Sequence, residues 1–271
     1  MLELKNIYKT FNPGTINEKR ALNGLNLKLN EGDFVTVIGG NGAGKSTMLN
    51  AVAGTWPVDE GQILIDNIDV TKLSEHKRAT YLGRVFQDPM TGTAATMGIE
   101  ENLALAKRRG KSRLLRSGIT KAEREEYKEL LKILGLGLED RLTSKVGLLS
   151  GGQRQALTLL MATLQKPKLL LLDEHTAALD PKTAAKVLEI TDMIVNRDHL
   201  TTLMITHNMK DAIAHGNRLI MMMEGKIILD IQGEEKKKTR QLKTFWISLK
   251  KQAEKSSAMT LHCSDNRINY S

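Results

Sequence analysis

The sequence predicts an α/β fold with a mixed β-sheet, and three stretches of the 271-residue chain carry this prediction. The segment FVTVIG (34–39) is typical of a buried strand, and a glycine-rich loop and an apolar helical segment follow it directly. Pro167 and Asp173 enclose a run of leucines that indicates a strand buried on both faces, as in parallel sheets. Near the N-terminus, apolar residues alternate as in antiparallel strands with one buried face, at Leu25, Leu27 and Leu29.

The composition is that of a globular protein and excludes several other classes. Hydrophobic residues make up 41% of the chain and charged residues 26%. No apolar run approaches the roughly 20 residues that a membrane-spanning helix needs, and the first residues, MLELKNIYKTF, lack the apolar region of a signal peptide. The single cysteine, Cys263, rules out an intrachain disulfide framework and fits a reducing compartment.

The formal net charge of +9 suggests contact with nucleic acid or with an anionic membrane surface, but the distribution of the charge weakens this interpretation. Much of it lies in the segment KRRGKSRLLR (107–116) and in residues 239–271. We interpret the first segment as a solvated basic loop, with contact to acidic lipid or to a partner protein as the alternative. We therefore expect no nucleic-acid partner.

The segment GGNGAGKST (39–47) matches the P-loop pattern G-x4-G-K-[ST], in the strand, loop and helix context that this pattern requires. Its glycines allow consecutive backbone N–H groups to surround phosphate oxygens, and the N-terminus of the following helix adds a favourable dipole. Lys45 can reach the β- and γ-phosphates, and Ser46 offers a hydroxyl to Mg²⁺. The alternative is a glycine turn with a surface lysine. The motif predicts a P-loop NTPase core that binds ATP and Mg²⁺ through Gly39, Asn41, Gly42, Ala43, Gly44, Lys45, Ser46 and Thr47.

The segment KLLLLDEH (168–175) supplies the carboxylate that a P-loop needs for its metal. Asp173 and Glu174 lie at the C-terminal end of the predicted leucine strand, where open α/β sheets place their ligands. We expect Asp173 to bind Mg²⁺ through water. Strand alternation would turn Glu174 the other way, where it can take a proton from an attacking water. A cluster of acids that caps a helix is the alternative.

A second glycine motif, LSGGQ (149–153), precedes a segment with the apolar spacing of an amphipathic helix. Ser150 alone would be explained as the N-cap of that helix. The complete P-loop earlier in the chain favours a second role for this motif, which is contact with a nucleotide. A single nucleotide would use two glycine motifs only if it lies between them.

In their order along the chain, these motifs resemble those of the ATP-binding subunits of ABC transporters. The resemblance covers about residues 1–235 and rests on GGNGAGKST (39–47), VFQD (85–88), LSGGQ (149–153), LLLLDE (169–174), AALD (177–180) and ITH (205–207). In this family two ATPase domains pack head to tail, and each ATP lies between the P-loop of one domain and the LSGGQ motif of the other. The resemblance therefore implies a homodimer, or a paired ATPase subunit, with two composite sites.

The resemblance also implies roles for single residues on both sides of such a site. Phe11 would stack on adenine, although a core position for Phe11 and a stacking role for Tyr8 are alternatives. Gln87 would contact Mg²⁺ or the attacking water, and Asp180 would cross the interface and order the partner's site. The implied catalytic residues are Glu174, His207, Gln87 and Lys45; the implied metal ligands are Ser46, Gln87 and Asp173; and the implied ligands of the partner's γ-phosphate are Ser150, Gly151, Gly152 and Gln153.

We divide the chain into an ABC ATPase domain at 1–238 and a tail at 239–271. Residues 1–38 are predicted to form antiparallel strands, and a helical subdomain with a capping box at Thr120 and Glu123 is inserted at about 89–148. The tail lacks periodicity, and we interpret it as a frameshift product. The preceding GEEKKK can be encoded by a run of adenines, and a shift of one base permits the amphipathic segment STVEDLLDLFEKASGKEF. Sequencing the gene through the Lys236 codons tests this interpretation.

The expected function is that of an ATP hydrolase that powers solute transport across the cytoplasmic membrane through a separate permease. The chain would be a peripheral subunit on the cytoplasmic face, and an extracellular substrate-binding protein is a further expected partner. Segments around AALD and after His207 resemble those of amino-acid-type uptake systems. The alternative is a non-transport ABC ATPase that acts on nucleic acid or ribosomes, which the short insert disfavours. An inactive scaffold is disfavoured because Lys45, Asp173, Glu174 and His207 are all present.

Overall fold

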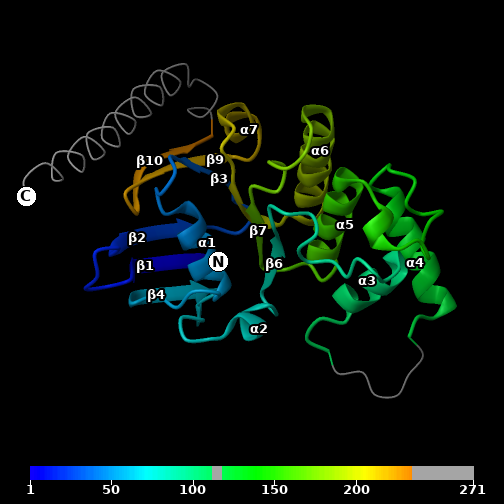
Figure 1. Cartoon of the computed structure of the whole chain (residues 1–271), viewed down its shortest axis with the longest axis horizontal. Helices are drawn as coiled ribbons and strands as arrows, with labels where there is room; N and C mark the ends of the chain where they lie inside the picture. Colours follow the sequence, from blue (N-terminus) through cyan, green and yellow to red (C-terminus); the bar gives the residue numbers. More distant parts are fainter. Residues whose placement is uncertain (112–117, 234–271) are drawn as a thin grey trace, which may run out of the picture.

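The computed structural model describes residues 1–111 and 118–233, which form a small sheet, a large sheet and the helices around them (Figure 1). The small sheet has four strands in the order β2-β1-β4-β5, and each neighbouring pair is antiparallel. Its strands are β1 (Leu2–Phe11), β2 (Lys19–Leu29), β4 (Glu60–Ile65) and β5 (Ile68–Asp69). The tail that we interpret as a frameshift product lies outside the described residues, as does 112–116 of the basic segment.

The large sheet has six strands in the order β10-β9-β3-β8-β7-β6, and all of its neighbouring strands are parallel except β9 and β10. These strands are β3 (Phe34–Gly39), β6 (Leu82–Val85), β7 (Leu169–Asp173), β8 (Thr201–Ile205), β9 (Arg218–Met223) and β10 (Lys226–Gln232). The expectation that residues 1–38 are all antiparallel strands is therefore wrong for β3. This strand leaves the small sheet and pairs in parallel with β8 and β9, because both of its faces are buried.

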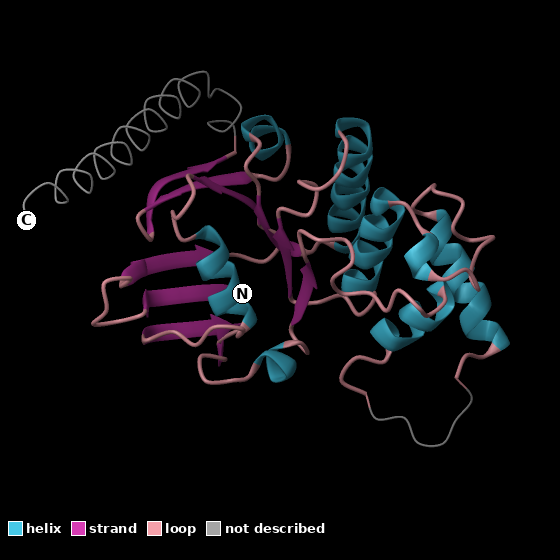
Figure 2. Cartoon of the chain, viewed as in Figure 1, coloured by secondary structure: helices cyan, strands magenta, loops and turns pink. Residues whose placement is uncertain are grey.

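Helices cover both sides of the large sheet, and Figure 2 separates them by colour from the strands. They are α1 (Lys45–Ala53), α2 (Glu75–Arg78), α3 (Ile99–Lys107), α4 (Lys121–Lys132), α5 (Gly151–Thr163), α6 (Pro181–Asp198) and α7 (Met209–Ala214), with a short 3₁₀ turn at Val146–Leu148. Within the described residues, no helix combines the length and the apolar character that crossing a membrane would require.

The leucine strand β7 divides the hydrophobic core into two layers, as its run of apolar residues predicted. Leu169 and Leu171 pack with α1 and the small sheet, whereas Leu170 and Leu172 pack with α3, α5 and α6. Helix α1 thus lies between the two sheets (Figure 1). This arrangement holds the N-terminus of α1 and the C-terminal ends of β3, β7 and β8 in the same region, and open α/β sheets bind their ligands at the C-terminal ends of the strands.

The segment between β6 and α5 carries helices α3 and α4, and its predicted capping box is present. The hydroxyl of Thr120 accepts a hydrogen bond from the backbone N–H of Glu123 at 3.2 Å, and the Thr120 N–H donates to the Glu123 carboxylate at 2.8 Å. Arg124 of α4 forms an ion pair with Glu100 of α3, with Nε 2.5 Å from Oε2. These contacts fix α4 against α3.

Arg78 ends α2 and is almost fully buried beneath the C-terminus of α1. Its guanidinium donates to the carbonyl oxygens of Ala51 and Val52 at 2.6 and 2.9 Å, and to those of Thr71 and Leu73 at 2.8 and 2.9 Å. A cation at the C-terminus of a helix is favourable because the helix dipole is negative there. Arg78 therefore supplies hydrogen-bond donors to the last carbonyl groups of α1, of which that of Ala51 also accepts a weaker hydrogen bond of 3.3 Å from the Gly54 N–H.

Candidate functional site

The glycine loop connects β3 to α1, which begins at Lys45. Gly44 precedes the helix with a φ of 97°, in the left-handed region that favours glycine. A Cβ at Gly44 would lie 2.5 Å from the backbone oxygen of Ala21 on β2. The backbone angle and the close approach of β2 both exclude a side chain here, so the fold of the loop itself requires this glycine.

Lys45 is buried at the start of α1, and its ammonium group donates to carbonyl oxygens of its own loop. The distances are 2.9 Å to Gly39 and 3.1 Å to Gly40. Burial lowers the pKa of Lys45, and the nearby carboxylates of Glu174 and Asp173 oppose this shift. The structure therefore brings together the lysine and the two acids that the sequence selected.

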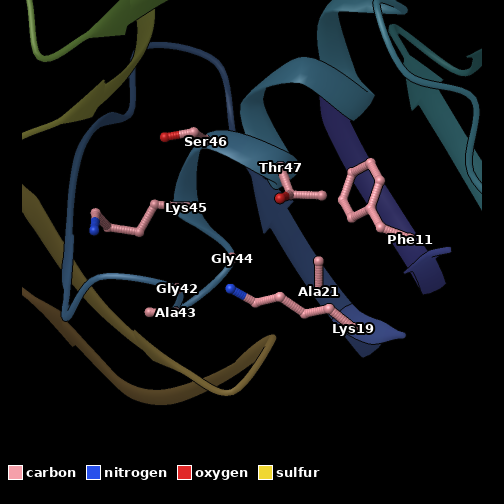
Figure 3. A pocket seen from close by; sticks show the side chains of 9 residues that line it. All are labelled: Phe11, Lys19, Ala21, Gly42, Ala43, Gly44, Lys45, Ser46 and Thr47. Carbon is pink, nitrogen blue, oxygen red and sulfur yellow. The ribbon is translucent and has the colours of Figure 1, made fainter. Parts of the chain in front are cut away.

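A pocket beside the loop is lined by Phe11, Lys19, Ala21 and residues 42–47, which Figure 3 shows as sticks. Phe11 ends β1 in a partly buried position outside the hydrophobic core clusters, and its ring meets Trp56 edge-on with centroids 5.0 Å apart. Tyr8 does not line this pocket. An aromatic ring at one end and backbone N–H groups with lysines at the other suit a purine base and its phosphate chain.

Asp173 ends β7 with a partly buried carboxylate, and Arg84 of the neighbouring strand β6 faces it. The Arg84 guanidinium lies 3.5 Å from Asp173 Oδ2 and also donates to Asn50 Oδ1 of α1 at 2.8 Å. Burial raises the pKa of Asp173; Arg84 opposes this shift, and the Glu174 carboxylate adds to it. Arg84 therefore partly neutralises the carboxylate that the sequence assigned to a metal ion.

Glu174 faces the site for a reason other than the one predicted. The strand ends at Asp173, and Glu174 has a φ of 48°, so a left-handed turn and not strand alternation orients its side chain. Its Oε1 lies 2.6 Å from Nε2 of His207, which follows β8 and is 46% exposed at its side chain. The two residues assigned to the attacking water and the γ-phosphate are thus direct neighbours.

Gln87 lies in the exposed loop after β6, between the large sheet and the helical segment. The backbone oxygen of the preceding residue, Phe86, accepts a hydrogen bond of 2.9 Å from Nε2 of Gln155 in α5. The loop that carries Gln87 is therefore attached to the helix that begins at the LSGGQ motif.

The LSGGQ motif forms the N-terminus of α5, and Ser150 is its N-cap. The Ser150 hydroxyl accepts from the Gln153 N–H, and the Gln153 side chain accepts from the Ser150 N–H, both at 3.2 Å. Ser150 and Gly151 are exposed, as is Asp180, which caps α6. None of the LSGGQ residues, nor Asp180, lines the pocket beside the P-loop. The structure thus shows a helix cap at Ser150, and the two exposed residues of the motif, Ser150 and Gly151, lie away from the pocket of their own chain.

Gly152 of this motif lies against Thr183 in the first turn of α6. A Cβ added at Gly152 would overlap Cγ2 of Thr183, whereas one at Gly151 would lie 3.2 Å from the flexible end of Leu179. The absence of a side chain at Gly152 is therefore what allows α5 and α6 to approach each other.

We expect Gly152→Ala to lower the free energy of unfolding by about 1–2 kcal/mol, since overpacking outweighs the better helix propensity of alanine. In a Thr183→Ser background, which removes the overlapping methyl group, the same change should cost about 1 kcal/mol less. Urea unfolding of the four proteins of this double-mutant cycle measures both values. An equal cost in the two backgrounds would show that Thr183 is not the obstacle.

Sequence reasoning missed four residues around the site: Arg84, Lys19, Trp56 and His175. Arg84 lies on β6, shortly before Gln87 in the sequence. Only the pairing of β6 with β7 places its guanidinium beside Asp173. His175, to which the sequence assigned no chemistry, is fully buried, and its Nε2 lies 3.1 Å from the hydroxyl of Thr191 in α6. Burial lowers the pKa of His175 to about 4, so a neutral imidazole fixes the segment after Glu174 to α6.

Comparison with known proteins decides the family, because a model of the ABC transporter family matches residues 22–177. The chain belongs to the ABC transporter family. It is 46% identical over 237 residues to the tyrosine transport ATP-binding protein of Clostridioides difficile, covering 87% of this chain and 94% of that protein. It is 34% identical to the spermidine/putrescine import ATP-binding protein PotA of Haemophilus influenzae over 232 residues, which is 85% of this chain and 57% of that protein.

Solved ABC cassettes share the fold of the chain. A dimeric post-hydrolysis cassette bound to ADP and Pi matches with a TM-score of 0.72 and 32% identity, covering 86% of this chain and 98% of that one. A cassette in an ADP conformation matches with a TM-score of 0.74 and 27% identity, over 91% and 98% of the two chains. The predicted fold class and the ATP-hydrolysing, transport-coupled ABC subunit are therefore confirmed.

Proposed function

We propose that this ABC ATPase powers the uptake of an amino acid, with tyrosine as the first candidate, through a separate membrane permease. The observation that carries this proposal is the 46% identity to a tyrosine transport ATP-binding protein over nearly the full length of that relative. The proposed subunit is peripheral on the cytoplasmic face of the membrane. The permease and an extracellular substrate-binding protein complete the proposed system.

The proposed unit of ATP hydrolysis is a head-to-tail dimer with ATP between the P-loop pocket of one subunit and the LSGGQ motif of the other. Two features support this geometry. The pocket has an aromatic and a phosphate-binding end but no LSGGQ residue, and Ser150 and Gly151 are exposed at the N-terminus of α5, where backbone N–H groups favour an anion. Two of the solved structures that share the fold are dimeric.

Mg²⁺ fits the donors that this chain offers near Lys45. The Ser46 hydroxyl, the Asp173 carboxylate and the Gln87 amide oxygen are hard oxygen ligands of the kind that Mg²⁺ prefers, and Asp173 retains a carboxylate that the Arg84 cation only partly compensates. Bound there, Mg²⁺ would neutralise charge on the β- and γ-phosphates. In the proposed complex, the hydrogen bond to Asn50 fixes the Arg84 guanidinium, which in turn holds the Asp173 carboxylate in place.

The proposed chemistry is phosphoryl transfer to water. Lys45 leaves the carbonyl oxygens of Gly39 and Gly40 and binds the phosphate chain, while the loop N–H groups stabilise charge. Glu174 orients the water and takes its proton, and His207 moves from Glu174 to the γ-phosphate. The partner-directed residues are Ser150, Gly151, Gly152, Gln153 and Asp180, and Phe11 stacks on adenine.

Deletion of the gene in its host should abolish the uptake of radiolabelled tyrosine, with plasmid-borne wild-type gene restoring it. Lys45→Ala, which removes the phosphate-binding lysine, should fail to restore uptake although the protein is present at wild-type abundance. If the deletion strain still takes up tyrosine but no longer takes up another amino acid, tyrosine is wrong as the cargo and the proposed role in amino-acid uptake stands. Unchanged uptake of all amino acids tested would overturn both.

A further inference from the structure

Lys19 places a second ammonium group in the nucleotide pocket, separate from that of Lys45. It begins β2 and pairs across the sheet with Phe11, the last residue of β1. A Cβ at Gly42 would lie 3.1 Å from Nζ of Lys19, so this ammonium group is in contact distance of the P-loop backbone. Figure 3 shows Lys19 reaching from the side of Phe11 toward Gly42, with the Lys45 side chain beyond the loop.

Lys19 is an exposed residue at the pocket, and its ammonium group has no anionic partner among the described residues. The residues that line the pocket include two lysines and no carboxylate. Within residues 1–111 and 118–233, Lys19 forms no hydrogen bond or ion pair, whereas Lys9 on the neighbouring strand pairs with Asp59 at 2.8 Å. The positive end of the α1 dipole faces the same pocket. The ammonium group of Lys19 is therefore available to bind a negative group that enters the pocket.

We propose that Lys19 binds the phosphate chain on the side of the base, at the α- and β-phosphates that ATP and ADP share. The order of groups along the pocket supports this position. Phe11, which we propose stacks on the base, pairs with Lys19; the Lys19 ammonium group lies beside Gly42; and the Lys45 ammonium group lies at Gly39 and Gly40. Lys19 is thus a specificity-determining residue for nucleoside di- and triphosphates. This inference rests on the proposed assignment of the nucleotide to the P-loop pocket.

The position of Lys19 gives it a different effect from that of Lys45. Because its ligand atoms are present in both substrate and product, Lys19 strengthens the binding of ATP and ADP to the same degree. Such uniform binding lowers KM and leaves the chemical step unchanged.

The test is the affinity of Lys19→Ala for nucleotides, measured by isothermal titration calorimetry with ATP, ADP and adenosine. We expect Kd to rise about tenfold for ATP and for ADP, as for the loss of a charge-assisted hydrogen bond, and to stay unchanged for adenosine. Lys19→Arg should stay within about twofold of wild type, since it keeps the charge. Arg20→Ala is the matched control, because it removes one exposed positive charge from the adjacent position, which faces the other side of β2.

Thermal unfolding without nucleotide separates binding from a structural role. Without nucleotide, the melting temperature of Lys19→Ala should be at or above that of the wild type. The rise in melting temperature that a given concentration of ADP produces should be smaller in Lys19→Ala than in the wild type. Unchanged Kd values for ATP and ADP, or an equal rise for adenosine, would overturn the proposal. If Lys45→Ala also leaves the affinity for ATP unchanged, the assignment of the nucleotide to this pocket fails with it. If Lys45→Ala weakens ATP binding and Lys19→Ala does not, only the role of Lys19 fails.

Discussion

Glu174→Gln should lower the rate of ATP hydrolysis by about 10²–10⁴-fold while leaving ATP bound, because the amide cannot accept the proton of the attacking water. Glu174 is turned toward the site by its left-handed backbone and lies 2.6 Å from His207. The glutamine side chain has the same shape and keeps a hydrogen bond to His207, so the fold and the pocket should persist. With hydrolysis blocked, ATP should convert this variant into a dimer, which size-exclusion chromatography with light scattering detects.

The control for this experiment is Ser150→Arg in the Glu174→Gln background. Ser150 is exposed and lies away from the pocket of its own chain, so the arginine should leave monomer folding and ATP affinity largely intact and abolish the dimer. A dimer that forms equally well with arginine at this position would contradict the head-to-tail arrangement. A variant that binds ATP and stays monomeric at high concentration would assign dimer formation to the permease.

Arg78→Met should lower the free energy of unfolding by about 3 kcal/mol, although residue 78 is remote from the nucleotide pocket. Methionine fills much of the space but leaves the buried carbonyl oxygen of Val52 without the Arg78 donor, and that of Ala51 with only the 3.3 Å hydrogen bond from the Gly54 N–H. Loss of a donor to a buried carbonyl group costs about 1–3 kcal/mol. Gly54 makes room for the guanidinium, since a Cβ there would be 2.8 Å from Nε of Arg78. Urea denaturation of the purified protein measures the loss.

Lys77→Met provides the comparison for Arg78→Met, because it makes the neighbouring, exposed cation apolar in the same short helix. We expect its free energy of unfolding to stay within about 0.5 kcal/mol of wild type. Similar losses in the two variants would mean that the hydrogen bonds of Arg78 to α1 contribute little. The assumption of a two-state transition is checked by following fluorescence and far-UV circular dichroism together.

The sequence was most informative where chemistry and local structure impose the same residues. Gly44 is such a case, because both the phosphate cradle and the approach of Ala21 require glycine. The leucine run predicted a doubly buried parallel strand, and β7 is one. The individual roles of the site residues, the boundaries at 89–148 and the frameshift interpretation of 239–271 remain predictions.

What the sequence did not predict depends on contacts between distant segments. Arg84 reaches Asp173 only through the pairing of β6 with β7, and Lys19 enters the pocket only through the pairing of β2 with β1. The orientation of Glu174 was predicted from strand alternation. The strand ends one residue earlier, at Asp173, and the positive φ of Glu174 determines the direction of its side chain instead. Likewise, Ser150 caps α5 within its own chain, and a contact of its exposed face with a partner depends on a second chain.

The close packing of Gly152 on Thr183 has a consequence for communication between the two sites of a dimer. The LSGGQ motif begins α5, and the segment with Asp180 begins α6, so this contact packs the two elements that we propose face the partner directly against each other. In the proposed head-to-tail dimer, we expect these two elements of one subunit to move together. A shift of the LSGGQ motif away from one ATP would then also displace Asp180, which we propose to contact the partner's site.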